Sequence, residues 1–157
     1  MARSFKLTAD GGSRGNPGPA GYGAVVTENG KIVAELFDVI GVATNNVAEY
    51  SGLLAGLSHI HHLDQAATVE VAMDSKLVVE QMSGRWQIKH ADMRDLAKQC
   101  RAAHDPSLVT YSWIPRDENS HADRLANKAL DGGSAHKPIA VVQQNFLTDR
   151  LRSAEVP

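Results

Sequence analysis

Four carboxylates in this sequence lie where a strand is expected to end or a helix to begin. They are Asp10, Glu49, Asp74 and Asp123. Each has an ordinary explanation taken alone, because the helix dipole favours an acid in a first turn and an Asp after a strand is common in turns. Two acids at strand ends on one edge of a sheet, with two at the starts of helices that cover it, nevertheless predict a common meeting point.

The chemistry expected of such a cluster follows from charge. Four carboxylates in one pocket repel one another and hold protons unless hard cations lie between them. Mg²⁺ is the natural ion, because it takes carboxylate oxygens, keeps waters and completes its shell with substrate phosphate; Mn²⁺ stays open as an alternative. Two such ions about 4 Å apart can activate a water molecule and stabilise a leaving oxygen at phosphorus. The cluster therefore predicts phosphodiester hydrolysis.

Alternating apolar and polar residues predict the strands that carry two of these acids. Residues 4–10 form one such run, which ends at Asp10 and is followed by a glycine-rich stretch expected to be a loop that a ligand can approach closely. Residues 68–74 end in the same way at Asp74. Further strands are expected at residues 21–27, 31–40 and 108–114. The pair Asn29-Gly30 is a hairpin signal, so the first three strands should be antiparallel.

Apolar residues at three- and four-residue steps predict the helices. The first follows the capping residues Thr44-Asn45-Asn46 and has Glu49 in its first turn. The others are expected at residues 75–82, 93–104 and 121–130, the last with Asp123 in its first turn. Strands and helices in this order predict an α/β domain whose helices start at the edge of the sheet where two strands end.

Composition limits the classes of protein that remain. A chain of 157 residues with 43% hydrophobic and 22% charged residues is expected to be one globular domain. It has no long apolar run and no leader at its start, which predicts a cytoplasmic protein without a membrane partner. A single cysteine, Cys100, is expected in a helix core. His59, His61 and His62 could suggest a metal site. Histidines near a helix C-terminus, however, more often interact with the helix dipole or lie at the surface.

The net charge of −2, from 16 basic and 18 acidic residues, argues against a broad basic face. Setting aside the four clustered carboxylates leaves 14 acids (18 − 4) against 16 bases, a mildly basic remainder. Any affinity for nucleic acid should therefore be modest and depend on bound cations.

An ordered set of motifs points to one family. Asp10-Gly11-Gly12-Ser13, Thr44-Asn45-Asn46 with Glu49, Met73-Asp74-Ser75, and Asn119 with Ala122-Asp123-Arg124-Leu125-Ala126 closely resemble type 1 ribonuclease H, over about residues 3 to 131. The resemblance implies the α/β ribonuclease H-like fold, a five-stranded mixed sheet with its first three strands antiparallel and helices on both faces. It also implies cleavage of the RNA strand of RNA/DNA hybrids, leaving 5′-phosphate and 3′-hydroxyl ends. Residues 1–131 would form this domain and residues 132–157 a linker or C-terminal tail.

The resemblance also implies residue roles. Asp10 would bridge two Mg²⁺ ions, Asp123 would help hold the ion that activates water, and Glu49 and Asp74 would hold the ion at the leaving oxygen. Glu49 would also touch a ribose 2′-hydroxyl, the group that distinguishes RNA from DNA. The residues implied to contact the hybrid are Gly11, Gly12, Ser13, Asn16, Thr44, Asn45, Asn46, Lys76, Trp86 and Lys89.

Two departures from the family matter. Many members carry a catalytic His in a long loop before the final Asp, but the segment here is short, so Arg116 is the expected substitute, with His121 second and a surface Arg of no function as the plain alternative. The basic handle of larger relatives is replaced by residues 83–89, where Trp86 is either a stacking residue or a packing residue. We therefore expect weaker, more salt-sensitive hybrid binding than in handle-bearing relatives.

Several alternatives stay open at this point. Members with the strings Asn-Asn-Val-Ala-Glu-Tyr and Met-Asp-Ser-Lys-Leu-Val-Val-Glu-Gln-Met-Ser-Gly, both present here, continue into a phosphatase-like domain, before which this chain stops. A non-catalytic hybrid-binding module would require a broken carboxylate set, and all four acids are present. The same fold acting on double-stranded RNA or on ribonucleotides embedded in DNA is not distinguished. A monomer is the default expectation.

Overall fold

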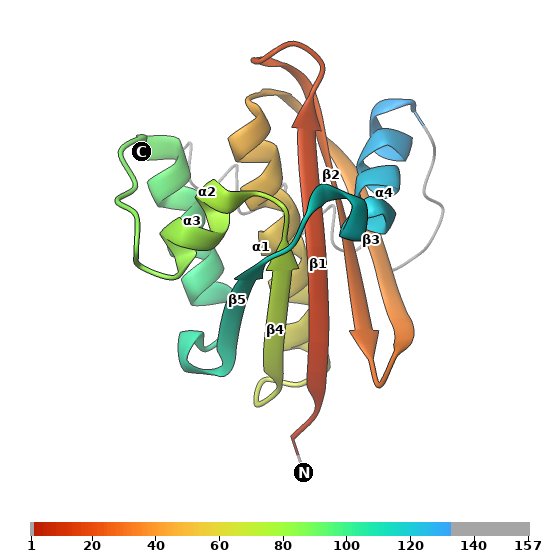
Figure 1. Ribbon diagram of the computed structural model, residues 1–157, viewed down its shortest axis with the longest axis vertical. Coiled ribbons are helices and arrows are strands. Elements are labelled where there is room, and N and C mark those ends of the chain that lie inside the picture. Colours follow the sequence, from red (N-terminus) through yellow and green to blue (C-terminus); the bar gives the residue numbers. More distant parts are fainter. Residues whose placement is uncertain (1, 133–157) are drawn as a thin grey trace.

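The computed structural model describes residues 2–132, which form a mixed five-stranded sheet in the order β3-β2-β1-β4-β5 with helices on both faces (Figure 1). The strand β1 lies at the centre, antiparallel to β2 and parallel to β4. This confirms the predicted fold class. The strands are β1 (Ser4–Ser13), β2 (Gly18–Glu28), β3 (Lys31–Ala43), β4 (Thr68–Met73) and β5 (Val109–Trp113). The α-helices are α1 (Asn45–Leu63), α2 (Lys76–Met82), α3 (Ala91–Ala103) and α4 (Ser120–Leu130).

Two apolar clusters define the two faces of the sheet. The larger cluster joins one face to α1, α2 and α3, and includes Leu7 and Val26. The smaller cluster joins the other face to α4 and includes Val25 and Leu125. Neighbouring residues of β2 therefore point into different cores, as the two-residue period of a strand requires. Cys100 is buried in the larger cluster on α3, as predicted.

The strands are longer than the sequence pattern indicated. β1 continues through the stretch predicted as a glycine-rich loop, because Gly11, Gly12 and Ser13 pair with β2. The prediction that β1 ends at Asp10 is therefore wrong, and the connection shrinks to residues 14–17. Alternation of apolar residues gives no signal here, since glycines have no side chain to alternate.

The helix starts agree with the sequence in all but one respect. The Thr44 side chain accepts a hydrogen bond from the Val47 amide, which confirms the predicted cap. Asp123 lies in the first turn of α4, as expected. Glu49, however, is the fifth residue of α1, whose first turn contains no acid. The helix dipole therefore does not explain its presence, and a functional explanation gains weight.

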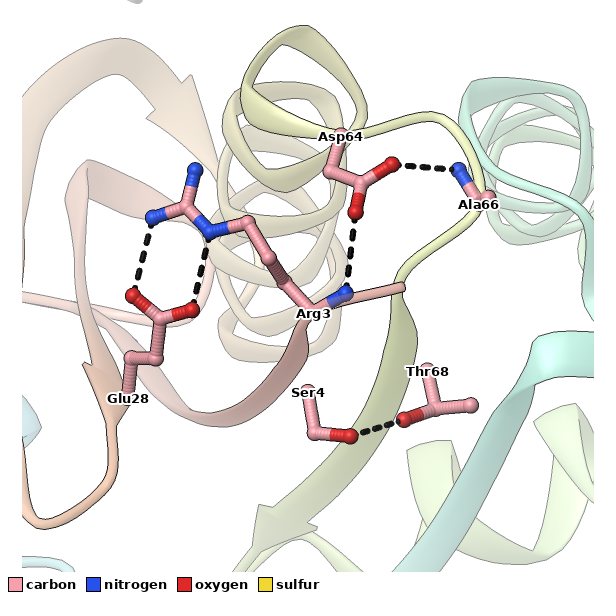
Figure 2. A network of polar contacts seen from close by, with 6 residues as sticks. All are labelled: Arg3, Ser4, Glu28, Asp64, Ala66 and Thr68. Atoms are coloured by element: carbon pink, nitrogen blue, oxygen red, sulfur yellow. Dashed lines mark hydrogen bonds and ion pairs between the residues drawn. The ribbon is translucent and has the colours of Figure 1, made fainter. Parts of the chain in front are cut away.

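A polar network fastens the sheet at the edge where β1 begins (Figure 2). The Arg3 guanidinium donates two hydrogen bonds of 2.8 Å to the Glu28 carboxylate, in the hairpin between β2 and β3. The Arg3 amide donates to Asp64, just after α1, over 3.0 Å. Ser4 and Thr68 share a hydrogen bond of 2.6 Å between the first residues of β1 and β4. Arg3 thus joins β1 to two connections of the fold, and the neighbouring Ser4 joins the starts of β1 and β4.

Within residues 2–132, no helix has the length and apolar character needed to span a bilayer. The expected tail, residues 132–157, lies outside the described residues apart from Gly132, so the domain boundary stays a prediction.

Candidate active site

Strand register places the first two acids side by side. β1 and β4 are parallel, and Ala9 pairs with Met73. The residues that follow this pair are Asp10 and Asp74, so the two acids lie side by side where β4 ends, with Asp10 inside the longer β1 and Asp74 directly after β4. The carboxyl ends of parallel strands are the usual place for ligands in α/β folds.

A glycine brings Glu49 to this edge. Gly11 follows Asp10, and a Cβ at that position would lie 2.3 Å from the Ala48 carbonyl carbon and 2.4 Å from the Glu49 amide nitrogen. No side chain fits in that space, so the backbone of α1 rests directly on β1. This contact holds the second turn of α1 against the strand that carries Asp10.

A second glycine brings Asp123 from the opposite face. Gly23 of β2 pairs with Asp10 across the antiparallel ladder. A Cβ at Gly23 would lie 2.3 Å from the Ala122 carbonyl oxygen, so the first turn of α4 lies directly on β2. The two close approaches, one on each face, bracket Asp10 between Glu49 and Asp123.

The four acids interact electrostatically as a group. Asp10 is only 9% exposed. Burial, then the charge of Asp74, a hydrogen bond with the Asp123 side chain and the charge of Glu49 raise the pKa of Asp10 to about 8. Burial likewise raises the pKa of Glu49 to about 7, with Asp74 adding to the shift. Both groups therefore tend to hold protons near neutral pH, which is the behaviour expected of carboxylates crowded without a counter-charge.

Two polar residues that sequence reasoning did not assign to the site hold the acids in place. Asn119 is 2% exposed, and its side-chain amide donates to the Ala9 carbonyl over 2.9 Å and to the Asp74 carboxylate over 2.7 Å. Ser75 caps α2 and also hydrogen-bonds Glu49, which lowers the pKa of that acid against the effect of burial. Asn119 was part of the recognised motif, but only its burial between two strands reveals what it does.

The two candidates for the missing loop histidine lie in different places. Arg116 is 88% exposed, and its Nε lies 3.7 Å from the Asp74 carboxylate. Its charge also lowers the pKa of Glu49. The His121 Nε2 lies 2.6 Å from the Glu35 carboxylate, on β3. The structure therefore places Arg116 beside the acids and pairs His121 with a different residue.

The predicted hybrid contacts fall into two groups. In the first, the Ser13 amide donates to the Asn45 side chain over 2.7 Å, and the Asn45 amide donates to the Asn16 side chain over 3.1 Å. Thr44 caps the same helix, and Asn46 lies in its first turn. These contacts use side-chain oxygens of the two asparagines, so their NH₂ groups remain available as donors.

The second group lies on α2 and the segment that follows it. The Lys76 ammonium lies 5.9 Å from the centre of the Trp113 ring and 3.9 Å from the Glu80 carboxylate. Trp86 is 46% exposed, and Lys89 is exposed as well. Trp86 is therefore accessible to a ligand, and its role as a stacking residue stays a prediction.

The donor set suits a hard cation. All four acids offer oxygen, and the Glu49 Oε2 is buried without a hydrogen-bond partner. Among residues 2–132, no three His, Cys, Asp or Glu side chains are already arranged around a single ion position. Mg²⁺ usually takes one or two carboxylates and completes its octahedron with water and substrate phosphate, so it does not need three protein ligands.

Known proteins are similar to this chain in sequence and in fold. A family model for reverse transcriptase-like proteins matches residues 8–129. The bifunctional protein Rv2228c of Mycobacterium tuberculosis is 55% identical over 131 residues, which are 82% of this chain and 36% of that protein. The solved N-terminal RNase H domain of Rv2228c is 52% identical, with a TM-score of 0.78 over 84% of this chain and 96% of that one. LC11-RNase H1, solved in complex with an RNA/DNA hybrid, is 36% identical, with a TM-score of 0.76 over 82% of this chain and 97% of that one.

The extent of these matches differs between whole proteins and domains. The chain spans about a third, 36%, of the length of the mycobacterial relatives. It covers nearly all of the solved domains. The similarity thus concerns the unit described above, sheet and helices together.

Proposed function

Because the chain belongs to the type 1 ribonuclease H family, we propose that it is an endonuclease that hydrolyses the RNA strand of RNA/DNA hybrids with two Mg²⁺ ions, leaving 5′-phosphate and 3′-hydroxyl ends. The observation that carries this proposal is the gathering of four acids from β1, α1, the end of β4 and α4 around one buried carboxylate, Asp10. A hybrid-binding module would have no use for such a costly cluster. A hybrid complex of a 36% identical relative supports the substrate.

Each acid has a distinct task in this proposal. Mg²⁺ ions held by these acids would supply an activated water molecule and stabilise the leaving oxygen at phosphorus. Asp10 interacts with all three other acids and would hold both ions, with Asp123 on the water side. Glu49 and Asp74 would serve the leaving-group side. Asn119 keeps the Asp74 carboxylate directed into the cluster. Arg116, exposed at the surface beside Asp74, would contact the scissile phosphate.

Recognition of the RNA strand would come from the shallow minor groove of the hybrid. Ser13, Asn16 and Asn45 are linked by hydrogen bonds into one rigid group next to the acids. Glu49 would accept a hydrogen bond from a ribose 2′-hydroxyl, a group that DNA lacks. A duplex without 2′-hydroxyls near the acids would bind without being cut.

Length-matched labelled duplexes test the proposal. The panel is RNA/DNA, double-stranded RNA, DNA with one embedded ribonucleotide and double-stranded DNA, each with Mg²⁺, Mn²⁺ or EDTA. We expect cutting of the RNA strand of the hybrid with either ion and none with EDTA. Hybrid binding without cleavage would favour the non-catalytic module, and cutting of double-stranded RNA or at the embedded ribonucleotide would change the substrate class.

A pair of variants tests the carboxylate assignment. Asp74→Asn should abolish cleavage and keep the fold, because its amide oxygen can still accept the hydrogen bond from Asn119. Asp117→Asn is the matched control, since Asp117 is exposed in the neighbouring 3₁₀ turn Arg116–Glu118. Full activity of Asp74→Asn would contradict the assignment.

A further inference from the structure

A half-exposed tryptophan contacts the backbone of one of the four acids. Trp113 is the last residue of β5, and its side chain is 48% exposed. Its indole Nε1 donates a hydrogen bond of 3.1 Å to the main-chain carbonyl of Asp74. Trp113 pairs with Met73, so Asp74 is the first residue beyond the ladder that joins β4 to β5. The indole hydrogen bond thus joins β5 to one residue beyond the strand pairing, and that residue is Asp74.

Asp74 is thus held at two points. The indole of Trp113 fixes its main chain, and the amide of Asn119 fixes one oxygen of its carboxylate. The Ile114 amide also donates to the Met73 carbonyl over 2.9 Å, which anchors the preceding residue. With both ends of a short side chain fixed, the direction of the carboxylate is set before any ligand arrives.

The indole itself is held in place. The Lys76 ammonium lies 5.9 Å from the centre of the Trp113 ring, within the range of a cation–π contact. Lys76 is held in turn by the Glu80 carboxylate, 3.9 Å away. An aromatic side chain that is half in solvent gains little from burial, so its hydrogen bond and its cationic neighbour are the contacts that explain its orientation.

We propose that Trp113 is a positioning residue for Asp74: its indole N–H fixes the Asp74 main chain and thereby the direction in which the carboxylate faces its ligands. The inference rests on the proposed function, because Asp74 is taken there as a ligand of a divalent ion. It assigns a role to a residue outside the recognised motifs. It predicts that loss of the N–H alone weakens ion binding and slows turnover while substrate affinity is kept.

Trp113→Phe removes the indole N–H and keeps an aromatic ring at this position. Free Mn²⁺, followed by its EPR signal without substrate, reports ion binding independently of activity. Loss of one hydrogen bond should weaken Mn²⁺ binding by roughly three- to tenfold. We expect kcat on the hybrid to fall by a similar factor, with KM changed less than twofold. Thermal unfolding confirms that the variant is folded.

Two further proteins sharpen the test. Trp86→Phe alters an indole of nearly equal exposure on the segment between α2 and α3, and should raise KM while Mn²⁺ affinity stays at the wild-type value. Benzothienylalanine at position 113 keeps the shape of the indole and replaces N–H by sulfur, so it should reproduce the loss seen with Trp113→Phe even if phenylalanine disturbs packing.

The outcomes distinguish this inference from the proposed function. Wild-type Mn²⁺ affinity and kcat in the benzothienylalanine protein would overturn the positioning role while leaving the nuclease intact. A wild-type protein that cuts no hybrid would refute the proposed function, and the Mn²⁺ comparison would still decide whether Trp113 orients Asp74.

Discussion

Among the four acids, Asp10 is the one whose ionisation the cluster disfavours most. It is buried, faces three other acids and has a pKa raised to about 8. An acid whose folded pKa exceeds its unfolded value binds more protons in the native state, so without divalent ions it lowers stability as pH rises from about 4 to 8. Divalent ions should reverse this effect, because they offset the negative charge.

Asp10→Asn should therefore separate stability from activity. The variant loses the carboxylate that we propose holds both ions, and we expect no detectable cleavage. It also loses a buried charge, and without divalent ions its free energy of unfolding at pH 8 should exceed that of the wild type by about 2 kcal/mol. The gain should be smaller at pH 5, where Asp10 is protonated. Urea unfolding with EDTA at both pH values measures it; a gain that did not grow with pH would contradict the raised pKa.

At the scale of residues, the sequence identified the acids but not their supports. The four acids could be found because the alternation of the strands and the caps of the helices that carry them are local properties, although β1 does not end at Asp10. The roles of Asn119 and Trp113 depend on contacts with Asp74, which is 45 and 39 residues away respectively. No local pattern encodes such contacts, so only the folded chain reveals them.

Among the elements, α4 depends on the absence of a side chain at Gly23. Gly23→Ala would place a Cβ 2.3 Å from the Ala122 carbonyl oxygen, and backbone cannot move aside as a side chain can. We expect α4 to shift, with a loss of at least about 2 kcal/mol in stability and a fall in kcat of more than tenfold, because Asp123 moves with the helix. Urea unfolding and hybrid cleavage measure the two effects.

The matched control is Gly12→Ala, also in the sheet, where a Cβ would have no heavy atom within 4 Å. Its free energy of unfolding should stay within about 0.5 kcal/mol of the wild type. Equal destabilisation by both alanines would show that glycine flexibility, and not the close approach of α4, is what the protein needs.

The segment between α2 and α3 is held from inside by Gln81. This side chain accepts a hydrogen bond of 2.7 Å from the buried Tyr50 hydroxyl and donates one of 3.4 Å to the Gln87 carbonyl. Tyr50→Phe removes only the hydroxyl. We expect a loss of about 1 kcal/mol in stability and a severalfold rise in KM for the hybrid at nearly constant kcat, because Trp86 and Lys89 lie on this segment.

Tyr111→Phe is the control for that experiment, since it removes a hydroxyl from β5 rather than from the support of this segment. Its KM should match the wild type. An unchanged KM in Tyr50→Phe, or an equal rise in both variants, would show that Gln81 does not position the segment between α2 and α3 for hybrid binding.

Element types and order were predicted well, because periodicity and caps are local. The length of β1 was not, since Gly11 and Gly12 carry a turn signal that pairing with β2 overrides. The position of Glu49 was also wrong by one turn, because α1 begins directly after its Thr44 cap.

For the whole molecule, charge sets how the hybrid binds. The net charge is −2, and the cations expected to touch phosphate are few. KM should therefore rise with salt, and Lys89→Ala should reduce the slope of log KM against log salt by about one. Lys6→Ala, an exposed lysine on β1, should leave the slope unchanged. A flat slope for the wild type would rule out direct phosphate contacts.

The polar network around Arg3 has a practical consequence. It anchors the start of β1 at the edge of the sheet opposite the acids, with Glu28 and Asp64 as its partners (Figure 2). A bead, fluorophore or fusion partner attached ahead of Arg3 would thus lie at the opposite end of β1 from the four acids, about 20 Å from Asp10 along the strand. Immobilised through that end, the protein should still accept long duplexes.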